Sequence, residues 1–84
     1  MPSPQVRLYA RPDCHLCDEA RAELERLRAD GLDFELAEVD IDSDDSLLKL
    51  YLERVPVIEV DGEVVSELWL DADGLRARLG TLSA

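Results

Sequence analysis

The first regular pattern in the chain is an alternation over residues 6–10, where Val6, Leu8 and Ala10 are separated by Arg7 and Tyr9. A period of two predicts a short β-strand, which the Arg11-Pro12-Asp13 segment ends. From Cys14 to about Asp30 the period lengthens, and apolar residues recur every three or four positions at Leu16, Ala20, Leu24 and Leu27. That spacing predicts a helix with one apolar stripe, and Gly31 predicts its end.

A second strand is predicted from Phe34 to Ile41, although its alternation slips between Leu36 and Val39. The acidic segment Asp42–Asp45 then offers N-cap oxygens and first-turn charges for a second helix. The apolar side of this helix consists of Leu47, Leu48 and Tyr51, and the helix must end before Pro56.

The last third of the chain predicts a hairpin followed by a helix. The third strand carries Val57, Ile58 and Val60, and Asp61-Gly62 is a strong signal for a two-residue turn. Residues 63–66 form the returning strand. Asp71 or Asp73 is placed to cap a short last helix, which carries Leu75 and Leu79 and which Gly80 is expected to end.

The element order is therefore βαβ followed by ββα. The first half requires a parallel pair of strands joined by a right-handed crossover, and the second half requires an antiparallel hairpin. We expect an α/β protein with a four-stranded mixed sheet and helices on both faces. The chain is short enough for one domain over residues 1–84.

Charge changes the range of partners that this fold can have. The net charge is −11, from 20 acidic against 9 basic residues. Such a surface repels nucleic-acid phosphates and anionic lipids, so we expect neither a nucleic-acid nor a membrane partner, and we expect a monomer. The N-terminal residues lack a signal-peptide pattern, and no apolar run approaches the ~20 residues of a membrane span. We therefore expect a cytoplasmic protein.

The chemistry is concentrated in a C-x-x-C motif, Cys14 and Cys17, where the first strand has ended and the first helix begins. Unpaired backbone N–H groups and the positive end of the helix dipole stabilise a thiolate at such a position. Cys17 lies one turn further on, close enough to form a disulfide. The motif predicts a redox pair in which Cys14 attacks a substrate disulfide and Cys17 resolves the mixed disulfide.

Charged neighbours act on this thiol in opposite directions. His15, when protonated, and Arg11 favour the thiolate of Cys14, so His15 is a candidate tuning residue. The carboxylates nearby, at Asp13, Asp18 and Glu19, favour the neutral thiol. The sign of their combined effect stays open at this point.

Three other interpretations of the cysteines compete with a redox pair. A zinc site needs about four ligands, whereas Cys14, His15 and Cys17 offer three, so we predict no metal. A purely structural disulfide would close so short a loop that it would stabilise little. Two inert cysteines would fall in this strand–breaker–helix setting only by coincidence.

Three segments together resemble one known family. Residues 8–17 (LYARPDCHLC) combine a strand, a basic residue, a proline and C-x-x-C; Arg54-Val55-Pro56 matches a T-V-P position; and residues 57–62 match the strand and turn that follow it. From Val6 to about Leu79, the chain resembles the glutaredoxin-like branch of the thioredoxin superfamily.

This resemblance implies a thioredoxin-like fold and thiol–disulfide oxidoreductase activity, that of a glutaredoxin-like disulfide reductase. It implies a cis Val55–Pro56 bond beside Cys14, and substrate binding by Arg11, Val55 and Pro56. The substrates would be protein disulfides or glutathione-containing disulfides. No cofactor would be required; glutathione is a candidate reductant, and a reductase is the other candidate electron donor.

The chain departs from the family after the hairpin, where Ser66-Glu67 replaces a Gly-Gly pair that holds glutathione. Side chains fill space that backbone would need, and the Glu67 carboxylate would repel an anionic tripeptide. We therefore expect weak glutathione binding, with Arg11 as the remaining basic residue and Asp71 as the candidate acidic one.

A different class of function is a non-catalytic thioredoxin-like module. Such a module could carry an iron–sulfur cluster between two subunits, through Cys14 and glutathione, or serve as a redox-sensing adaptor. Among the aromatic residues, Trp69 is expected in the core between the last helix and the sheet rather than at the rim of a substrate groove. The other three, Tyr9, Phe34 and Tyr51, are expected in the core or a groove wall.

Overall fold

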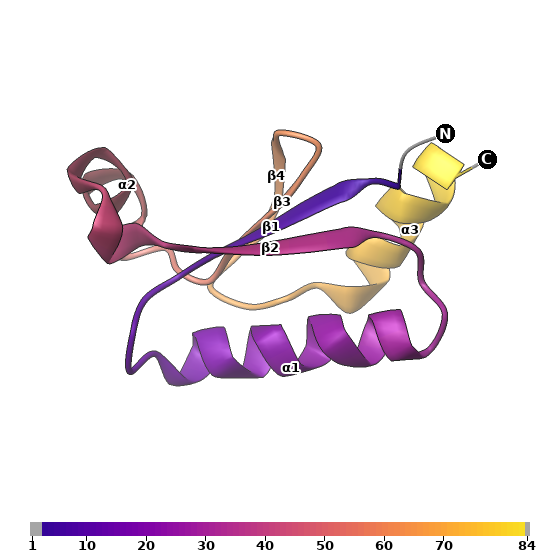
Figure 1. The fold of residues 1–84 in the computed structure, drawn as a ribbon, viewed down its shortest axis with the longest axis horizontal. Coiled ribbons are helices and arrows are strands. Elements are labelled where there is room, and N and C mark those ends of the chain that lie inside the picture. The colour runs from indigo at the N-terminus through magenta and orange to yellow at the C-terminus, as the bar shows by residue number, and fades with distance from the viewer. Residues whose placement is uncertain (1–2, 84) are drawn as a thin grey trace.

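The computed structural model describes residues 3–83, with side chains as far as residue 80, and it contains the predicted order of elements (Figure 1). A short 3-10 turn, η1, precedes the second helix. The bounds are β1 Gln5–Ala10, α1 His15–Ala29, β2 Glu35–Asp40, η1 Ile41–Ser43, α2 Asp45–Tyr51, β3 Val57–Val60, β4 Glu63–Glu67 and α3 Ala72–Ser83.

The four strands form one mixed sheet in the order β2-β1-β3-β4. β1 runs parallel to β2 and antiparallel to β3, and β4 returns antiparallel to β3. In this register Leu8 lies opposite Ile58 on β3. The predicted parallel pair and antiparallel hairpin are therefore both confirmed.

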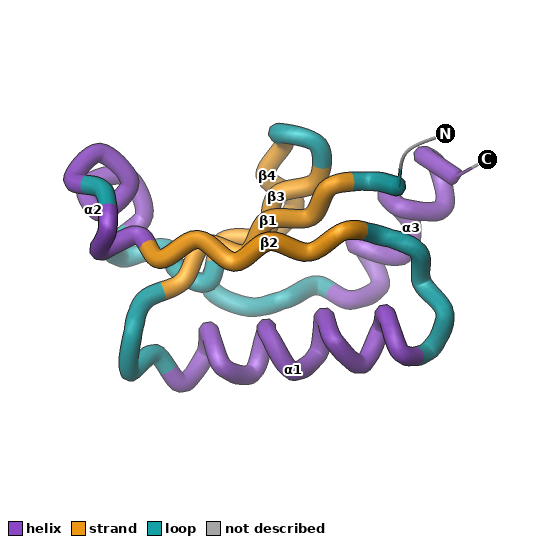
Figure 2. Tube along the Cα trace, viewed as in Figure 1, coloured by secondary structure: helices purple, strands orange, loops and turns teal. Residues whose placement is uncertain are grey.

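Helices cover both faces of this sheet, as the sequence predicted. α1 and α3 lie on one face, and α2 lies at one end of the molecule (Figures 1 and 2). From that end α2 contributes Tyr51 to the core on the other face. The larger core packs Leu24 of α1 and Leu75 of α3 against Leu8 and Ile58. The smaller core, on the other face, consists of Tyr9, Ile41, Tyr51 and Val57. Phe34 is buried in the larger core, so three of the four aromatic residues lie where they were expected.

The slipped alternation in β2 follows from its position at the edge of the sheet. Leu36 packs against the larger core, and Val39 packs against the smaller core on the opposite face. Successive side chains of a strand point to opposite faces, so residues 36 and 39 must serve different cores. The slipped alternation therefore arises because the first part of β2 faces the larger core and its last part faces the smaller core.

Local hydrogen bonds define the ends of α1. The Cys14 side chain caps the first turn, and Gly31 adopts a left-handed φ of 104° directly after the helix. The Leu32 N–H donates to the Leu27 carbonyl at 3.1 Å, which is the Schellman arrangement that a glycine at this position permits. The predicted end at Gly31 is therefore confirmed.

The last helix differs from its prediction at its far end. Gly80 lies inside α3, which continues to Ser83, so the prediction that Gly80 ends the helix was wrong. At the other end Asp71 is the residue that caps, because its Oδ1 accepts a 3.0 Å hydrogen bond from the Gly74 N–H. A glycine in a helix costs about 1 kcal/mol, an amount that packing of Leu75 and Leu79 in the core offsets.

The predicted turn at Asp61-Gly62 also ties the hairpin to β1. Asp61 and Gly62 have φ values of 49° and 89°, the two positive values that a type I′ turn requires. The Gln5 N–H donates to Asp61 Oδ1 at 2.9 Å, and the Asp61 N–H donates to the Gln5 carbonyl at 2.8 Å. Within residues 3–83, none of the helices combines the length and the apolar character that a bilayer crossing needs.

Candidate functional site

Cys14 and Cys17 form a disulfide at the start of α1, with their Cα atoms 5.2 Å apart. Cys14 is the N-cap residue and is partly exposed, whereas Cys17 is fully buried in the larger core. The Cys17 N–H donates to Cys14 Sγ at 3.2 Å, so a backbone donor of the first helical turn is aimed at the outer sulfur. One sulfur is therefore accessible and the other lies behind it.

The charged residues that flank this disulfide are paired with one another. Arg21 donates to Asp18 at 2.8 Å and also bonds Glu38 on β2, and these carboxylates raise the pKa of the Arg21 guanidinium. His15 is exposed, and its Nε2 lies 3.2 Å from Glu19 Oε1. Arg21 thus reduces the effect of Asp18 on the sulfur, whereas His15 does so for Glu19 only when the imidazole is protonated.

Arg11, the expected basic residue of the substrate site, is paired as well. Its Nε donates to Asp42 Oδ1 at 3.0 Å, which ties the loop after β1 to η1. Both side chains stay partly exposed, so this ion pair is weak and exchangeable. Asp42 engages only Nε, so the two terminal amino groups of the guanidinium can donate to a substrate while this pair is kept.

The Val55–Pro56 peptide bond is cis, as the family resemblance implied. Pro56 is buried, and Val55 packs against both cores. Cys14 packs against the larger of these cores too. The cysteine segment and the proline segment therefore border a common core, although they are about forty residues apart in sequence.

Leu68 holds the proline segment from the other side, and sequence analysis missed its role. Its N–H donates to the Arg54 carbonyl at 3.1 Å and to the Pro56 carbonyl at 2.9 Å. Leu68 has a φ of 68°, a left-handed conformation that is costly for a branched side chain. Ser66 and Glu67, the pair compared with glycines, are instead ordinary residues of β4 opposite Ile58 and Val57.

Glu67 is paired with Arg54, a residue that sequence analysis did not single out for any role. The Arg54 guanidinium donates to the Glu67 carboxylate and also lies over the Tyr51 ring, 5.4 Å from its centre. This hydrogen bond lowers the pKa of Glu67 and raises that of Arg54. Arg54 therefore offsets part of the charge that Glu67 was expected to present to glutathione, and the expected weak binding stays a prediction.

Trp69 is 63% exposed, so the prediction that it lies in the core was wrong. After Leu68 the chain turns so that Leu70, not Trp69, packs against the larger core. Leu68 and Leu16 are also about half exposed. The rim interpretation, which was the less favoured one, fits the structure.

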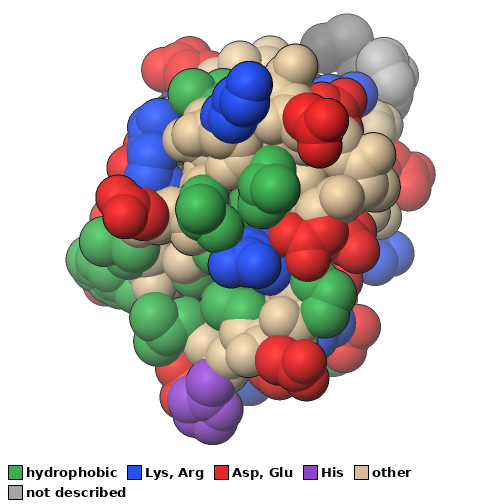
Figure 3. Space-filling model, turned by 90° about the vertical axis from the view of Figure 1, so that its left-hand side faces the viewer, with side chains coloured by type: hydrophobic (Ala, Val, Ile, Leu, Met, Phe, Trp, Pro, Cys, Tyr) green, Lys and Arg blue, Asp and Glu red, His purple; other side chains and the backbone are tan. Residues whose placement is uncertain are grey.

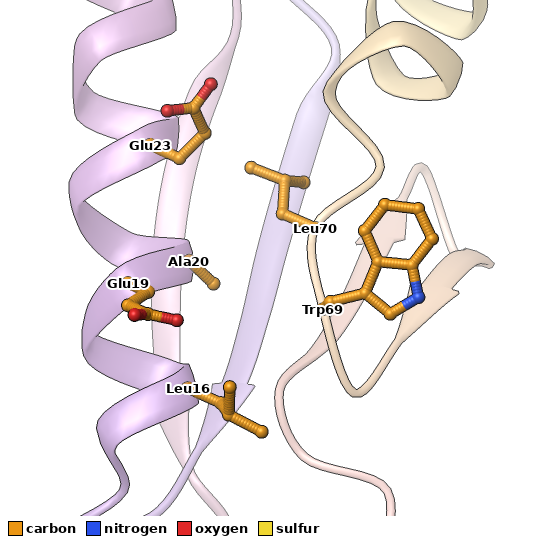
Figure 4. A pocket seen from close by; sticks show the side chains of 6 residues that line it. All are labelled: Leu16, Glu19, Ala20, Glu23, Trp69 and Leu70. Carbon is orange, nitrogen blue, oxygen red and sulfur yellow. The ribbon is translucent and has the colours of Figure 1, made fainter.

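A groove lies between α1 and the segment that joins β4 to α3 (Figure 4). We call it the Trp69 groove; it has a volume of about 260 Å³ and is lined by Leu16, Glu19, Ala20, Glu23, Trp69 and Leu70. Leu70 points toward α1, whereas the Trp69 ring extends from the segment in the direction away from α1. Figure 3 shows hydrophobic side chains gathered on the face that also carries the histidine.

The acidic, histidine and cysteine side chains of the described residues are dispersed. Nowhere in the described part of the chain do three or more His, Cys, Asp or Glu side chains stand close enough to hold a metal ion. His15 is directed to Glu19 rather than joined with the cysteines in such a group.

The fold and the paired cysteines define a thioredoxin-like domain with a C-x-x-C disulfide. The chain belongs to the glutaredoxin-like domain family (DUF836), whose model matches residues 5–80. Protein Ne2328 from Nitrosomonas europaea has a similar solution structure, with 32% identity, a TM-score of 0.80 and 93% of each chain covered. Protein XcR50 from X. campestris is 39% identical with a TM-score of 0.73, over 90% of this chain and 96% of that one.

More distant structures agree on the fold alone. A mutant thioredoxin from Halobacterium salinarum matches 99% of this chain and 77% of its own, with 24% identity and a TM-score of 0.71. Curated proteins provide no match to this chain.

Proposed function

We propose that this protein is a thiol–disulfide oxidoreductase in which Cys14 attacks and Cys17 resolves. The observation that carries the proposal is the asymmetry of the disulfide: Cys14 is partly exposed at the N-cap of α1, and Cys17 is buried one turn further on. A nucleophile must reach its substrate, whereas a resolving thiol needs to reach only the first cysteine.

The reaction begins with both cysteines reduced. The Cys14 thiolate attacks one sulfur of a substrate disulfide, so a new S–S bond forms, the old one breaks, and the leaving thiolate takes a proton from water. Cys17 then loses its proton and attacks Cys14 Sγ, which releases the second substrate thiol. Two electrons have passed to the substrate, and the protein is left with the Cys14–Cys17 disulfide.

The backbone at the start of α1 supports the first step. The Cys17 N–H that donates to Cys14 Sγ would stabilise the thiolate by the same hydrogen bond, and the helix dipole acts in the same direction. Arg21 offsets the charge of Asp18, so the opposing carboxylates are Asp13 and, while His15 is neutral, Glu19. We therefore expect Cys14 to be the more reactive thiol.

We further propose that protein disulfides are better substrates than glutathione disulfides. Exposed apolar side chains at Leu16, beside Cys17, and at Leu68 and Trp69 suit a polypeptide. Ser66 and Glu67 lie in β4, and no Gly-Gly pair follows the hairpin to hold glutathione. Two molecules of glutathione, which leave together as glutathione disulfide, or a flavoprotein reductase would return the two electrons. Val55 would offer backbone groups to the bound substrate, beside Pro56.

The proposal can be tested in a single turnover. Reduced protein is mixed with bis(2-hydroxyethyl) disulfide and quenched in acid. Its intact mass, measured by mass spectrometry, then distinguishes the dithiol, the mixed disulfide and the internal disulfide. We expect oxidation to the Cys14–Cys17 disulfide with the release of two equivalents of 2-mercaptoethanol, and no reaction in the Cys14→Ser variant.

Failure of the wild-type protein to react would overturn the proposal. In that case anaerobic reconstitution with iron and sulfide provides the decisive comparison. Visible absorbance would then favour a cluster-carrying module over a disulfide reductase.

A further inference from the structure

The Trp69 groove begins beside the disulfide and continues along α1. Leu16 is two residues from Cys14, and Ala20 and Glu23 lie one and two turns further along the same helix. A helix rises 1.5 Å per residue, so this stretch is roughly 9–13 Å from Cys14. An extended peptide covers that distance with about three or four residues.

The walls of the groove are apolar, and its rim is acidic. Leu16, Ala20, Leu70 and Trp69 supply the walls, while Glu19 and Glu23 stand along the α1 side. Arg26 donates to Glu23 at 3.0 Å and lowers its pKa, so Glu23 stays ionised. The partner of Glu19 is His15, which is charged only when protonated. Arg76 acts on Glu23 as well, so two permanent cations offset that carboxylate, and Glu19 is the rim carboxylate whose partner is not a permanent cation.

We propose that the Trp69 groove binds a segment of a partner polypeptide whose cysteine disulfide is attacked by Cys14. The segment presents an apolar side chain to the walls and a Lys or Arg to Glu19 and Glu23, about three or four residues from that cysteine. This inference rests on the proposed disulfide exchange and adds the sequence that the substrate carries around its disulfide.

Charge complementarity selects this occupant over two others. A second copy of the chain would bring its own net charge of −11 against the acidic rim, which is repulsive. Glutathione is anionic near neutral pH and has no apolar side chain to fill the groove. A basic, apolar peptide satisfies both the walls and the rim, and long-range attraction to the acidic surface increases its rate of encounter.

Small disulfide-bonded peptides can test the specificity directly. The probes are N-acetylated, C-amidated Cys-Gly-Gly-Leu-Lys and its reverse, Lys-Leu-Gly-Gly-Cys, each linked through cysteine to 2-thiopyridine, whose release is followed by absorbance. Matched probes replace Leu by Gly or Lys by Glu. Rates with reduced protein are divided by rates with dithiothreitol, which removes differences in the intrinsic reactivity of the probes.

We expect at least one Leu–Lys probe to react about tenfold faster than its Gly–Lys counterpart, since the groove removes the leucine side chain from water. The Leu–Lys probe should exceed the Leu–Glu probe by about threefold, as rim charges contribute less. Trp69→Ala should reduce the Leu/Gly ratio, and Glu19→Gln with Glu23→Gln should reduce the Lys/Glu ratio. Leu52→Ala, an exposed leucine just after α2, should leave both ratios unchanged.

Equal corrected rates for all probes, in a protein that still oxidises with bis(2-hydroxyethyl) disulfide, would overturn the groove assignment and leave the proposed function standing. No reaction with any disulfide would overturn both. A dimer in sedimentation equilibrium that Trp69→Ala converts to a monomer would assign the groove to a second copy instead.

Discussion

The two sides of the candidate site are held in different ways. The cysteine side depends on the first turn of α1, where the Cys17 N–H and the Asp18 N–H donate to the sulfur and the carbonyl of Cys14. The proline side depends on residues distant in sequence: Leu68 donates across to Arg54 and Pro56, and Arg54 binds Glu67. The reactive cysteines therefore lie on the side that is held by contacts within one helical turn. The other side is held by contacts between segments that are distant in sequence.

This difference assigns different expected roles to the two sides of the proposed site. A capped helix start depends on backbone geometry and tolerates substitution nearby. The β4–α3 connection presents exposed side chains whose replacement changes the surface that a substrate meets. We expect variants on the cysteine side to affect whether exchange occurs, and variants on the proline side to affect which substrate is used.

The largest effect is expected at the cysteines themselves. Cys14→Ser should abolish disulfide reduction, whereas Cys17→Ser should still attack but accumulate a mixed disulfide, because the buried resolving thiol is lost. Intact-protein mass spectrometry after incubation with bis(2-hydroxyethyl) disulfide distinguishes the two variants. If Cys17 in the Cys14→Ser protein formed an adduct as fast as Cys14 does in the Cys17→Ser protein, the proposed asymmetry between the cysteines would be contradicted.

A large effect on stability is expected from the helix that anchors the proline side. Leu75 of α3 is fully buried in the larger core, so Leu75→Ala should lower the free energy of unfolding by about 2–5 kcal/mol. Leu50→Ala, at a half-exposed leucine of α2, is the control and should change it by about 0.5 kcal/mol or less. Urea unfolding of both variants provides the measurement, and equal losses would contradict the assigned core.

A smaller effect is expected from the backbone of Leu68. Its φ of 68° favours glycine, so Leu68→Gly should be more stable than Leu68→Ala by about 1 kcal/mol. Both variants remove the same exposed side chain, so their difference in unfolding free energy reports on the backbone alone. An alanine variant as stable as the glycine variant would show that the left-handed conformation is not maintained.

Glutathione use should respond modestly to position 67. Glu67→Gly, alone or with Ser66→Gly, should increase glutathione-dependent turnover a few-fold, because it frees the Arg54 guanidinium for an anionic tripeptide. Adding Arg54→Gln should cancel the gain. If the unmodified protein already uses glutathione fully and these changes have no effect, the assigned role of position 67 is wrong.

The smallest expected effect is a change in the acid dependence of stability. Folding lowers the pKa of Glu67 through Arg54, so the pair stabilises the fold above the ordinary glutamate pKa of about 4.3 and loses that contribution as pH falls through the lower folded value. Glu67→Gln should flatten the decline in urea midpoint between about pH 4.5 and pH 2. Arg54→Gln should flatten it equally, and unequal changes would mean that other groups dominate.

The parts of the fold that could be predicted from sequence are those specified by neighbouring residues. The stripe of Leu16, Ala20, Leu24 and Leu27, the glycine at 31 and the Asp61-Gly62 turn each act within a few residues, and the elements they predicted are present. The C-x-x-C motif belongs to the same kind, because Cys14 and Cys17 are joined across a single helical turn.

The parts that could not be predicted depend on contacts between distant segments. Trp69 looked like a core residue because an isolated tryptophan usually is one, but Leu70 fills that place once Leu68 turns the chain. The Arg54–Glu67 pair requires β4 to lie beside the proline segment. No pattern within either segment indicates such a pairing.

The claim that Cys14 is the attacking thiol is tested most directly by alkylation of the fully reduced protein at pH 7. Iodoacetamide is added in a brief pulse, and the modified cysteine is identified by peptide mass mapping. We predict that Cys14 is labelled first and that Cys17 is protected by its burial. Faster labelling of Cys17 would contradict it and would reverse the roles of the two cysteines.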